Sequence, residues 1–298
     1  MKVLTDLDFN LEDTAVCIGK FDGFHRGHRA LVREAEKSGL TTVIITFLFP
    51  GHKGIYSYGE KRFLAEKLGV DYFVEIPATK EFMRMSAEQF VSDILMQRCH
   101  AKKVVVGADF CFGYRRLGTA STLIACGEEY GFSVCVMEKR KWKGEVISST
   151  RIRKLLAAGD MGQVNFLLEA PYFIKGRVEE GNKIGRTLSV PTANIRPSAE
   201  KELPPFGVYA VRVLAFGRLY DGVCNLGVKP TVSGVSPVGA EVWLFSYSGD
   251  LYGQEIVICL YAYQRPERKF ENMEKLKEQI QLDTEQAKRI LASLPEDE

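Results

Sequence analysis

The hydrophobic pattern of the chain changes about halfway along its length. Up to about residue 168, short apolar runs typical of buried strands alternate with amphipathic helical segments. Such alternation predicts a doubly wound parallel sheet covered by helices. From about residue 171, strand-like runs follow one another with a turn every ten or so residues, which favours a small antiparallel barrel or sandwich. We therefore predict a larger α/β domain over residues 1–168 and a smaller β-barrel domain over residues 169–298.

In the first half, the clearest unit is a strand, a helix and a second strand. Residues 14–18 form a buried strand pattern that ends at Gly19, and a helical run that stops at Gly39 leads to the strand pattern 42–47. This succession is one βαβ unit. Further predicted elements are a helix opened by the capping-box pair Ser86 and Gln89, strands over 104–106 and 132–136, and a helix over about 121–130.

The second half contains five clear strand patterns and one long helical pattern. An apolar stripe from Met273 to Leu291 has helical spacing, so we expect a C-terminal helix that packs against the barrel. The predicted strands cover residues 173–178, 208–214, 219–226, 240–245 and 255–262.

The composition and charge of the chain argue against several classes of protein. The chain has 40 Lys and Arg against 38 Asp and Glu, a net charge of +2, which is too little for a strongly electrostatic nucleic-acid or membrane-surface protein unless the charge is clustered. Seven cysteines without a CxxC pair indicate reduced thiols and no zinc site. The start lacks a signal-peptide pattern and no apolar run has the length of a membrane span. We expect a soluble cytoplasmic protein, and the oligomeric state stays open.

The segment after the first strand has the composition of a phosphate-binding turn. Glycines let the backbone approach a ligand closely, and the start of the next helix presents free N–H groups to an anion. His25 and His28 add two donors suited to a phosphate on which charge grows during reaction. A closed zinc site is disfavoured because two histidines lack further ligands nearby. The segment reads Gly19-Lys20-Phe21-Asp22-Gly23-Phe24-His25-Arg26-Gly27-His28.

A second candidate anion site lies at residues 147–153, ahead of another helical pattern. Ser149 and Thr150 can cap that helix, and Arg153 can bind phosphate oxygens. Capping alone would explain the hydroxyl groups. Taken together with the first segment, however, this one describes the two ends of a triphosphate site.

The second half has glycines ahead of a Thr/Asn pair but no Walker A motif. A glycine-rich stretch can close over phosphates, and the Thr192 hydroxyl and Asn194 carbonyl are neutral oxygen ligands that Mg²⁺ accepts beside a nucleotide. A hairpin loop with a turn at Pro191 is the alternative interpretation. The glycine-rich stretch contains Gly176, Gly181, Gly185 and Arg186.

These motifs resemble the HxGH and ISSTxxR/K motifs of nucleotidyltransferases. The first segment is most similar to the GxFDGxHxGH motif of the bacterial bifunctional riboflavin kinase/FMN adenylyltransferase family. Residues 106–113 also resemble that family's VGxDFxFG segment, which implies flavin binding, although an aromatic loop there is equally compatible with core packing. The residues concerned are Asp109, Phe110, Cys111 and Phe112.

The Thr/Asn segment is similar to the riboflavin kinase signature GRxLGFPTAN. The resemblance implies that Thr192 and Asn194 bind Mg-ATP and that Glu241 is the general base. A primary alcohol is a poor nucleophile, so a carboxylate that accepts its proton suits attack on the γ-phosphorus. Without the resemblance, Glu241 would be an ordinary exposed strand carboxylate.

The chain departs from the family pattern at a few positions. Residues Thr46-Phe47-Leu48-Phe49-Pro50 stand where the family usually reads TF(D/E)PHP, so the acid and the histidine of that segment are both lost. Thr119 and Ser246 each replace a common aspartate, and Ser189-Val190 replaces Gly-Phe. The phosphate motifs themselves are intact.

The resemblance implies ATP-dependent phosphorylation of riboflavin to FMN and adenylylation of FMN to FAD with release of pyrophosphate, both with Mg²⁺. Two alternatives stay open. The chain could be a riboflavin kinase whose first half binds nucleotide without turnover, as Leu48 and Phe49 would permit. It could also be a flavin-sensing regulator that binds nucleic acid through the basic segment 139–143, although that segment is better explained as a solvated hairpin tip.

Overall fold

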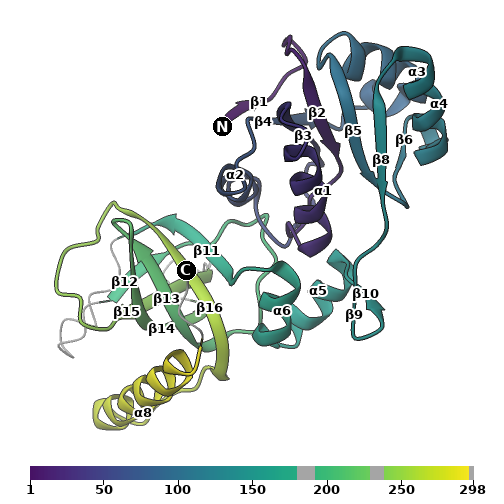
Figure 1. Cartoon of the computed structure of the whole chain (residues 1–298). Coiled ribbons are helices and arrows are strands. Elements are labelled where there is room, and N and C mark those ends of the chain that lie inside the picture. The colour runs from purple at the N-terminus through teal and green to yellow at the C-terminus, as the bar shows by residue number, and fades with distance from the viewer. Residues whose placement is uncertain (180–191, 229–237, 295–298) are drawn as a thin grey trace. The chain divides into compact units, whose positions relative to one another are not determined.

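A computed structural model describes residues 1–179, 192–228 and 238–294 (Figure 1). The chain divides into two compact units, Met1–Ser149 and Thr150–Glu298. Within the described residues, no helix has both the length and the apolar character needed to cross a membrane.

The first unit is built on a six-stranded sheet with the strand order β1-β4-β3-β2-β5-β8. Every neighbouring pair in this sheet is parallel, which confirms the predicted doubly wound class. The strands are β1 (Lys2–Leu4), β2 (Thr14–Ile18), β3 (Thr41–Leu48), β4 (Tyr72–Pro77), β5 (Ala101–Gly107) and β8 (Ser133–Met137).

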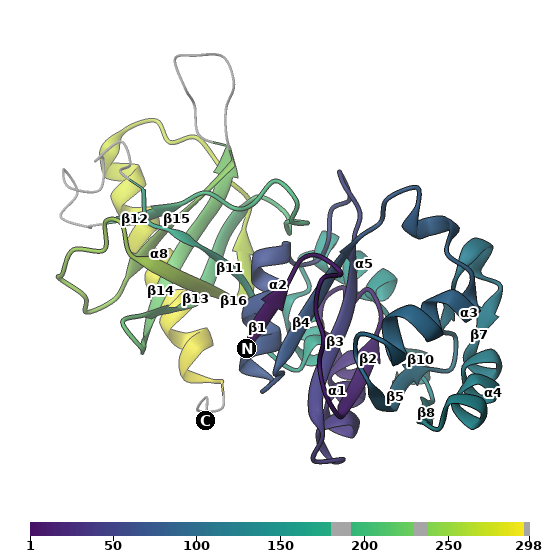
Figure 2. The same cartoon turned by 90° about the horizontal axis from the view of Figure 1, so that it is seen from above.

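Helices cover both faces of this sheet, as Figure 2 shows. One face packs against α1 (Arg26–Glu36) and α2 (Tyr58–Lys67). The other holds an apolar core cluster, where Val16 and Ile45 meet Phe90 and Leu123. These two come from a π-helical segment, η2 (Phe90–Met96), which continues α3 (Ala87–Gln89), and from α4 (Ala120–Tyr130).

Local capping explains where several of these helices begin. The predicted capping box of Ser86 and Gln89 is present at α3. A second box, in which Ser57 and Glu60 exchange hydrogen bonds, opens α2. The shorter elements of the unit are η1 (Phe82–Arg84), β6 (Cys111–Phe112), η3 (Tyr114–Arg116), β7 (Gly118–Thr119), β9 (Lys141–Trp142) and β10 (Glu145–Val146).

The second unit contains an antiparallel six-stranded sheet with the order β11-β16-β13-β14-β15-β12. A bridge from Glu179 to Asn194 brings the chain that follows β11 to the strand at the opposite edge, so the sheet curls into the predicted barrel. The strands are β11 (Tyr172–Arg177), β12 (Thr192–Ile195), β13 (Gly207–Ala215), β14 (Arg218–Val228), β15 (Val238–Leu244) and β16 (Glu255–Arg265).

Three helices accompany the barrel strands within the described residues. Helix α5 (Ser149–Ala157) starts at the division between the units, and α6 (Met161–Leu168) is tied to β16 by a hydrogen bond of 2.9 Å from Asn165 Nδ2 to the Leu260 carbonyl. The predicted C-terminal helix is α8 (Met273–Ala292). Its residues Ala287 and Leu291 pack with Ala210 of β13 and with Phe245, which follows β15, as predicted.

Candidate active sites

The first candidate site lies where the strand order of the parallel sheet reverses. Strand β2 is flanked by β3 on one side and β5 on the other. Because all three strands run in the same direction, the chain leaves β2 and β5 at one edge of the sheet. Open α/β sheets bind ligands in the crevice outside such a switch point. The glycine-rich turn follows β2, and the aromatic loop follows β5.

The glycine-rich turn is held in a constrained backbone conformation by two buried aromatic side chains. Phe21 and Phe24 are fully buried, with ring centroids 5.3 Å apart, and both adopt a positive φ of 45°. Gly23, at φ 87°, occupies a region that other residues rarely adopt. A side chain at Gly27 would begin 3.1 Å from the His25 ring. Burial of the aromatic rings thus fixes the turn, and the glycines make it possible.

The two histidines of the turn are stacked at the start of α1. His25 is the N-cap residue, and its Nδ1 accepts a hydrogen bond of 3.4 Å from the backbone N–H of His28. The ring centroids are 3.7 Å apart. His28 Nδ1 is buried and has no hydrogen-bond partner among the described residues. An orphaned buried nitrogen costs free energy, so it is the kind of atom that a bound ligand satisfies.

Both imidazoles are poorly protonated in this environment. Burial, opposed by the charge of Asp22, lowers the pKa of His25 to about 4. The pKa of His28 is held well below its ordinary value, first by burial and then by the positive charges of His25 and Lys61. At neutral pH the pair therefore offers neutral N–H and N groups rather than net charge.

The second predicted anion motif contacts the first through Ser149. The Ser149 hydroxyl donates a hydrogen bond of 2.8 Å to the Asp22 carbonyl, and the Asp22 carboxylate accepts one of 2.8 Å from Ile55 N. Thr150 and Arg153 belong to the second unit, where Arg153 Nε lies 2.8 Å from the Glu202 carboxylate. The contact to Asp22 is thus made by Ser149.

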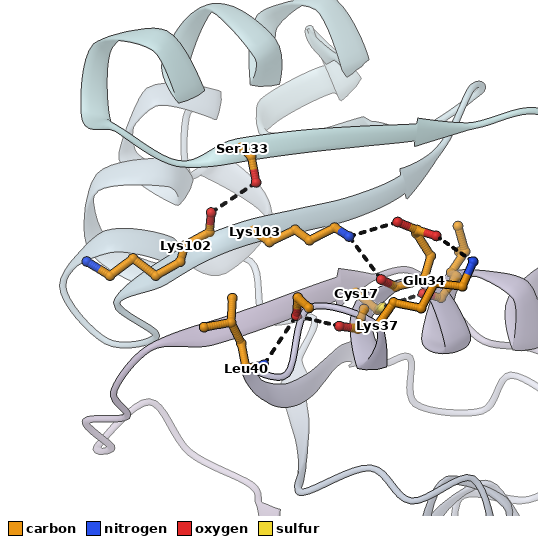
Figure 3. A network of polar contacts seen from close by, with 10 residues as sticks. Cys17, Glu34, Lys37, Leu40, Lys102, Lys103 and Ser133 are labelled. Carbon is orange, nitrogen blue, oxygen red and sulfur yellow. Dashed lines mark hydrogen bonds and ion pairs between the residues drawn. The ribbon is translucent and has the colours of Figure 1, made fainter.

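The position of α1, and with it the histidine pair, is fixed by a polar network at the far end of the helix (Figure 3). Lys103 Nζ on β5 donates to the Glu34 carbonyl at 3.0 Å and to the Glu34 carboxylate at 2.8 Å. The same carboxylate is 3.1 Å from Lys37 Nζ. Cys17 Sγ on β2 donates to the Leu31 carbonyl. The helix is thereby attached to the two strands that flank the crevice.

The aromatic loop after β5 combines core and surface residues. Phe110 and Phe112 are stacked with centroids 5.4 Å apart, and Phe112 is buried against Phe90. Asp109 is largely exposed and lies 2.9 Å from Lys139 Nζ. Cys111 is partly exposed. The loop therefore presents a polar edge beside an aromatic stack.

The second candidate site is a polar row across one face of the barrel sheet. Asn194 on β12 lies directly opposite Glu241 on β15, which in turn lies opposite Asn225 on β14. Thr192 lies two residues before Asn194, hence on the same face, and its hydroxyl donates a hydrogen bond of 2.6 Å to Glu241 Oε1. Asn225 Nδ2 donates to Glu267 at 2.9 Å. Register alone thus brings the predicted Thr, Asn and Glu together.

The glycines predicted to close over phosphates are only partly described. Gly176 is on β11, and a side chain there would reach ordinary contact with Ile195 at 3.4 Å. Gly181, Gly185 and Arg186 lie outside the described residues, as does the turn at Pro191.

Two groups of residues at these sites received no role from the sequence. Asn225 is placed in the polar row by strand register, and Glu267 by its hydrogen bond from Asn225. Lys61, buried on α2 beside the glycine-rich turn, had no motif to point to it. The Ser57 and Glu60 capping box would have placed Lys61 in a helix but not in a site.

The chain thus combines a glycine-rich turn with two histidines at the switch point of a parallel sheet and a Thr/Asn/Glu row on an antiparallel barrel. These features are those of a two-domain enzyme with one polar site in each domain. The family model for FAD synthetase matches residues 8–151, and that for riboflavin kinase matches residues 168–291. The chain belongs to the bifunctional riboflavin kinase/FMN adenylyltransferase family.

Curated relatives match over nearly their whole length. The bifunctional riboflavin kinase/FMN adenylyltransferase of Escherichia coli (strain K12) is 38% identical over 287 residues, 91% of each chain. That of Bacillus subtilis (strain 168) is 35% identical over 94% of this chain and 93% of its own. A solved structure described as a macrolide-efflux protein from Streptococcus pneumoniae is 28% identical, with a TM-score of 0.84 over 96% of this chain and 98% of its own.

Proposed function

We propose that this chain phosphorylates riboflavin to FMN and transfers an adenylyl group from ATP to FMN, giving FAD and pyrophosphate. The observation that carries the proposal is that both family models match one chain, each over a half that holds its own set of convergent polar groups. Riboflavin, FMN and ATP are the small-molecule substrates. We place the functional boundary at residues 168/169 and the protein in the cytoplasm.

In the first half, the FMN phosphate oxygen attacks the α-phosphorus of ATP, and pyrophosphate leaves without a covalent enzyme intermediate. His25 and His28 donate hydrogen bonds to the phosphate oxygens as charge develops. Helix α1 adds its N-terminal N–H groups. Further phosphate-binding residues in this proposal are Gly19, Phe21, Asp22, Gly23, Gly27, Ser149, Thr150 and Arg153.

The aromatic loop is the proposed flavin site of this half. Phe110 and Phe112 offer an aromatic stack next to the exposed Asp109. Cys111, between the two phenylalanines in the sequence, belongs to the same proposed site. A flat tricyclic ring packs well on such a stack, while a carboxylate at its edge can accept hydrogen bonds from ring N–H groups.

In the second half, Glu241 takes the proton from the riboflavin primary alcohol as its oxygen attacks the γ-phosphorus. The hydrogen bond from Thr192 supports this role because it orients the carboxylate on a rigid strand. Gly176, Gly181, Gly185 and Arg186 are proposed to bind the phosphates of ATP.

The Thr/Asn pair fits a magnesium ion bound with ATP. Thr192 and Asn194 present neutral oxygens on the same face as the Glu241 carboxylate, which is the hard donor set that Mg²⁺ prefers. When bound there, Mg²⁺ would neutralise charge on the nucleotide phosphates.

A time course of riboflavin with Mg-ATP, resolved by chromatography, tests the proposal. FMN should appear first and FAD should follow, with pyrophosphate released in proportion to FAD. FMN without any FAD would favour the kinase with a non-catalytic first half, which Leu48 and Phe49 support as a second candidate. In this chain Phe49 N donates to the Tyr58 hydroxyl, and Lys20 Nζ lies 5.0 Å from the Phe49 ring.

The basic segment 139–143 does not favour a nucleic-acid function. The segment contains β9, the first strand of the β9–β10 hairpin. Lys139, just before that strand, pairs with Asp109, and Lys143 lies 4.5 Å from the Trp142 ring. Salt-dependent binding to nucleic acid without turnover of riboflavin would contradict this assignment.

A further inference from the structure

Lys61 is a buried cation next to the glycine-rich turn. It lies in the first turn of α2 and is only 6% exposed, although lysine is one of the residues least often buried. Its ammonium lies 4.6 Å from the Tyr58 ring, and the Tyr58 hydroxyl is hydrogen-bonded to the backbone of Phe49. Burying an ammonium group has a high desolvation cost, which interactions with fixed groups or a bound anion must offset.

The Lys61 ammonium lies against the backbone of the turn itself. Its Nζ is 3.5 Å from the carbonyl of Lys20, the residue that follows Gly19. The same carbonyl accepts a hydrogen bond of 3.1 Å from the Thr46 hydroxyl on β3. The segment before α2 is attached to the turn as well, because Ile55 N donates to Asp22 Oδ1 at 2.8 Å. Lys61 is therefore held at the carboxyl edge of β2 and β3 by fixed neighbours.

Lys61 is one of several charged side chains buried in the first unit, together with Glu60 and Glu75. Glu60 Oε2 accepts hydrogen bonds from the N–H and hydroxyl of Ser57. The buried Glu75 carboxylate pairs with Arg62 through a hydrogen bond of 3.1 Å from Nε. The positive charge of Lys61 is felt at His28, whose pKa it helps to lower. The site thus combines two neutral imidazoles with one fixed ammonium group.

We infer that Lys61 is a further phosphate-binding residue of the adenylyltransferase site, and that it stabilises the charge that develops on the pyrophosphate leaving group. This inference rests on the proposed FMN adenylylation. As the FMN phosphate oxygen forms its bond to the α-phosphorus, the bond to the bridging oxygen breaks and its electron pair stays on pyrophosphate. Neutral histidines donate hydrogen bonds to those oxygens but bring no charge. A preorganised ammonium in a buried site stabilises the added charge without a proton transfer.

Substitution of Lys61 in the full-length protein tests the inference. Lys61→Met keeps the volume and removes the charge, Lys61→Gln keeps a hydrogen-bond donor, and Lys61→Arg restores the charge. Lys67→Gln, at the exposed end of the same helix, is the matched control. FMN adenylylation, riboflavin phosphorylation, thermal unfolding and pyrophosphate binding by calorimetry are measured for each.

We expect Lys61→Met and Lys61→Gln to lower kcat for FAD formation about 100-fold to 1000-fold and to weaken pyrophosphate binding at least about tenfold. Lys61→Arg should recover much of the rate, while riboflavin phosphorylation and the Lys67→Gln control stay unchanged. FAD formation within about twofold of wild type in a folded Lys61→Met protein would overturn the inference. The inference would also be overturned if Lys61→Arg lost as much FAD formation as Lys61→Met and both variants unfolded at a lower temperature. That combination indicates a structural role for Lys61. A wild-type protein that makes no FAD would instead refute the proposed function, and pyrophosphate binding would still decide the role of Lys61.

Discussion

The protonation of His25 links the site to the stability of the first unit. In the unfolded chain a histidine binds a proton near pH 6.5, whereas in the folded chain burial lowers the pKa of His25 to about 4. The unfolded state therefore binds more protons between these values. The stabilisation from this group is present above pH 6.5 and is lost as the pH falls towards 4.

We expect the unfolding free energy of the first unit to fall by about 2 kcal/mol more between pH 7 and pH 5 in wild type than in His25→Gln. Urea denaturation of both proteins at the two pH values measures this difference. If the unfolding free energy of the two proteins depended equally on pH, folding would not lower the pKa of His25, which would contradict this prediction.

Thr192 controls the orientation of the proposed general base. Its 2.6 Å hydrogen bond is made to Glu241 Oε1, so Thr192→Val removes the donor but keeps the side-chain shape. We expect Thr192→Val to lower kcat for riboflavin phosphorylation about tenfold or more and Thr192→Ser to recover most of it, with FAD formation from FMN unchanged. Initial rates of both reactions check this expectation, and equal rates in Val and Ser variants would contradict it.

At the scale of secondary-structure elements, the strands that could be predicted from the sequence are those whose apolar run is not interrupted by a charged residue. Strands β2, β3, β5 and β8 have continuous apolar runs, and each was expected. Strand β4 was not, because the fully buried Glu75 interrupts its apolar pattern and is matched by Arg62 only in the folded structure. Helix α2 was missed for a related reason, since it buries Glu60 and Lys61.

The same contrast holds for the candidate sites. The glycine-rich turn could be predicted because its residues are consecutive and its chemistry is local. The Asn225 and Glu267 extension of the polar row depends on strand register, and the position of Lys61 depends on the packing of α2 beside the turn. Neither arrangement leaves a signal in a single sequence.

An ion pair joins β16 to α8 and should contribute to the unfolding free energy of the second unit. Arg265 donates two hydrogen bonds to the buried Asp283 carboxylate, of 2.9 and 2.6 Å. Removing one partner of a buried pair leaves an uncompensated charge, so we expect Asp283→Ala to lower the unfolding free energy of the second unit by about 3 kcal/mol. Glu278→Gln, which disrupts an exposed pair on the same helix, should change it by less than about 0.5 kcal/mol. Chemical denaturation compares the two, and similar small effects would show that α8 is held by apolar packing alone.

At the scale of the whole molecule, the two proposed sites are centred in different compact units, on the histidine turn in the first and on the Thr192/Asn194/Glu241 row in the second. Each site lies on rigid elements: a helix start beside a parallel sheet in one unit, and strands of a barrel sheet in the other. A net charge of +2 is compatible with this proposal, because helix ends, imidazole N–H groups and single fixed cations can bind small anions locally. The two activities are therefore expected to be separable by single substitutions.

The assignment of one reaction to each half is tested most directly by measuring FMN and FAD formation in two variants of the full chain. His28→Ala should lower FAD formation from FMN about 100-fold or more and leave riboflavin phosphorylation intact. Glu241→Gln should do the reverse, lowering FMN formation by a comparable factor and sparing FAD formation. Loss of both activities in either folded variant, or loss of neither, would contradict the assignment of one reaction to each half.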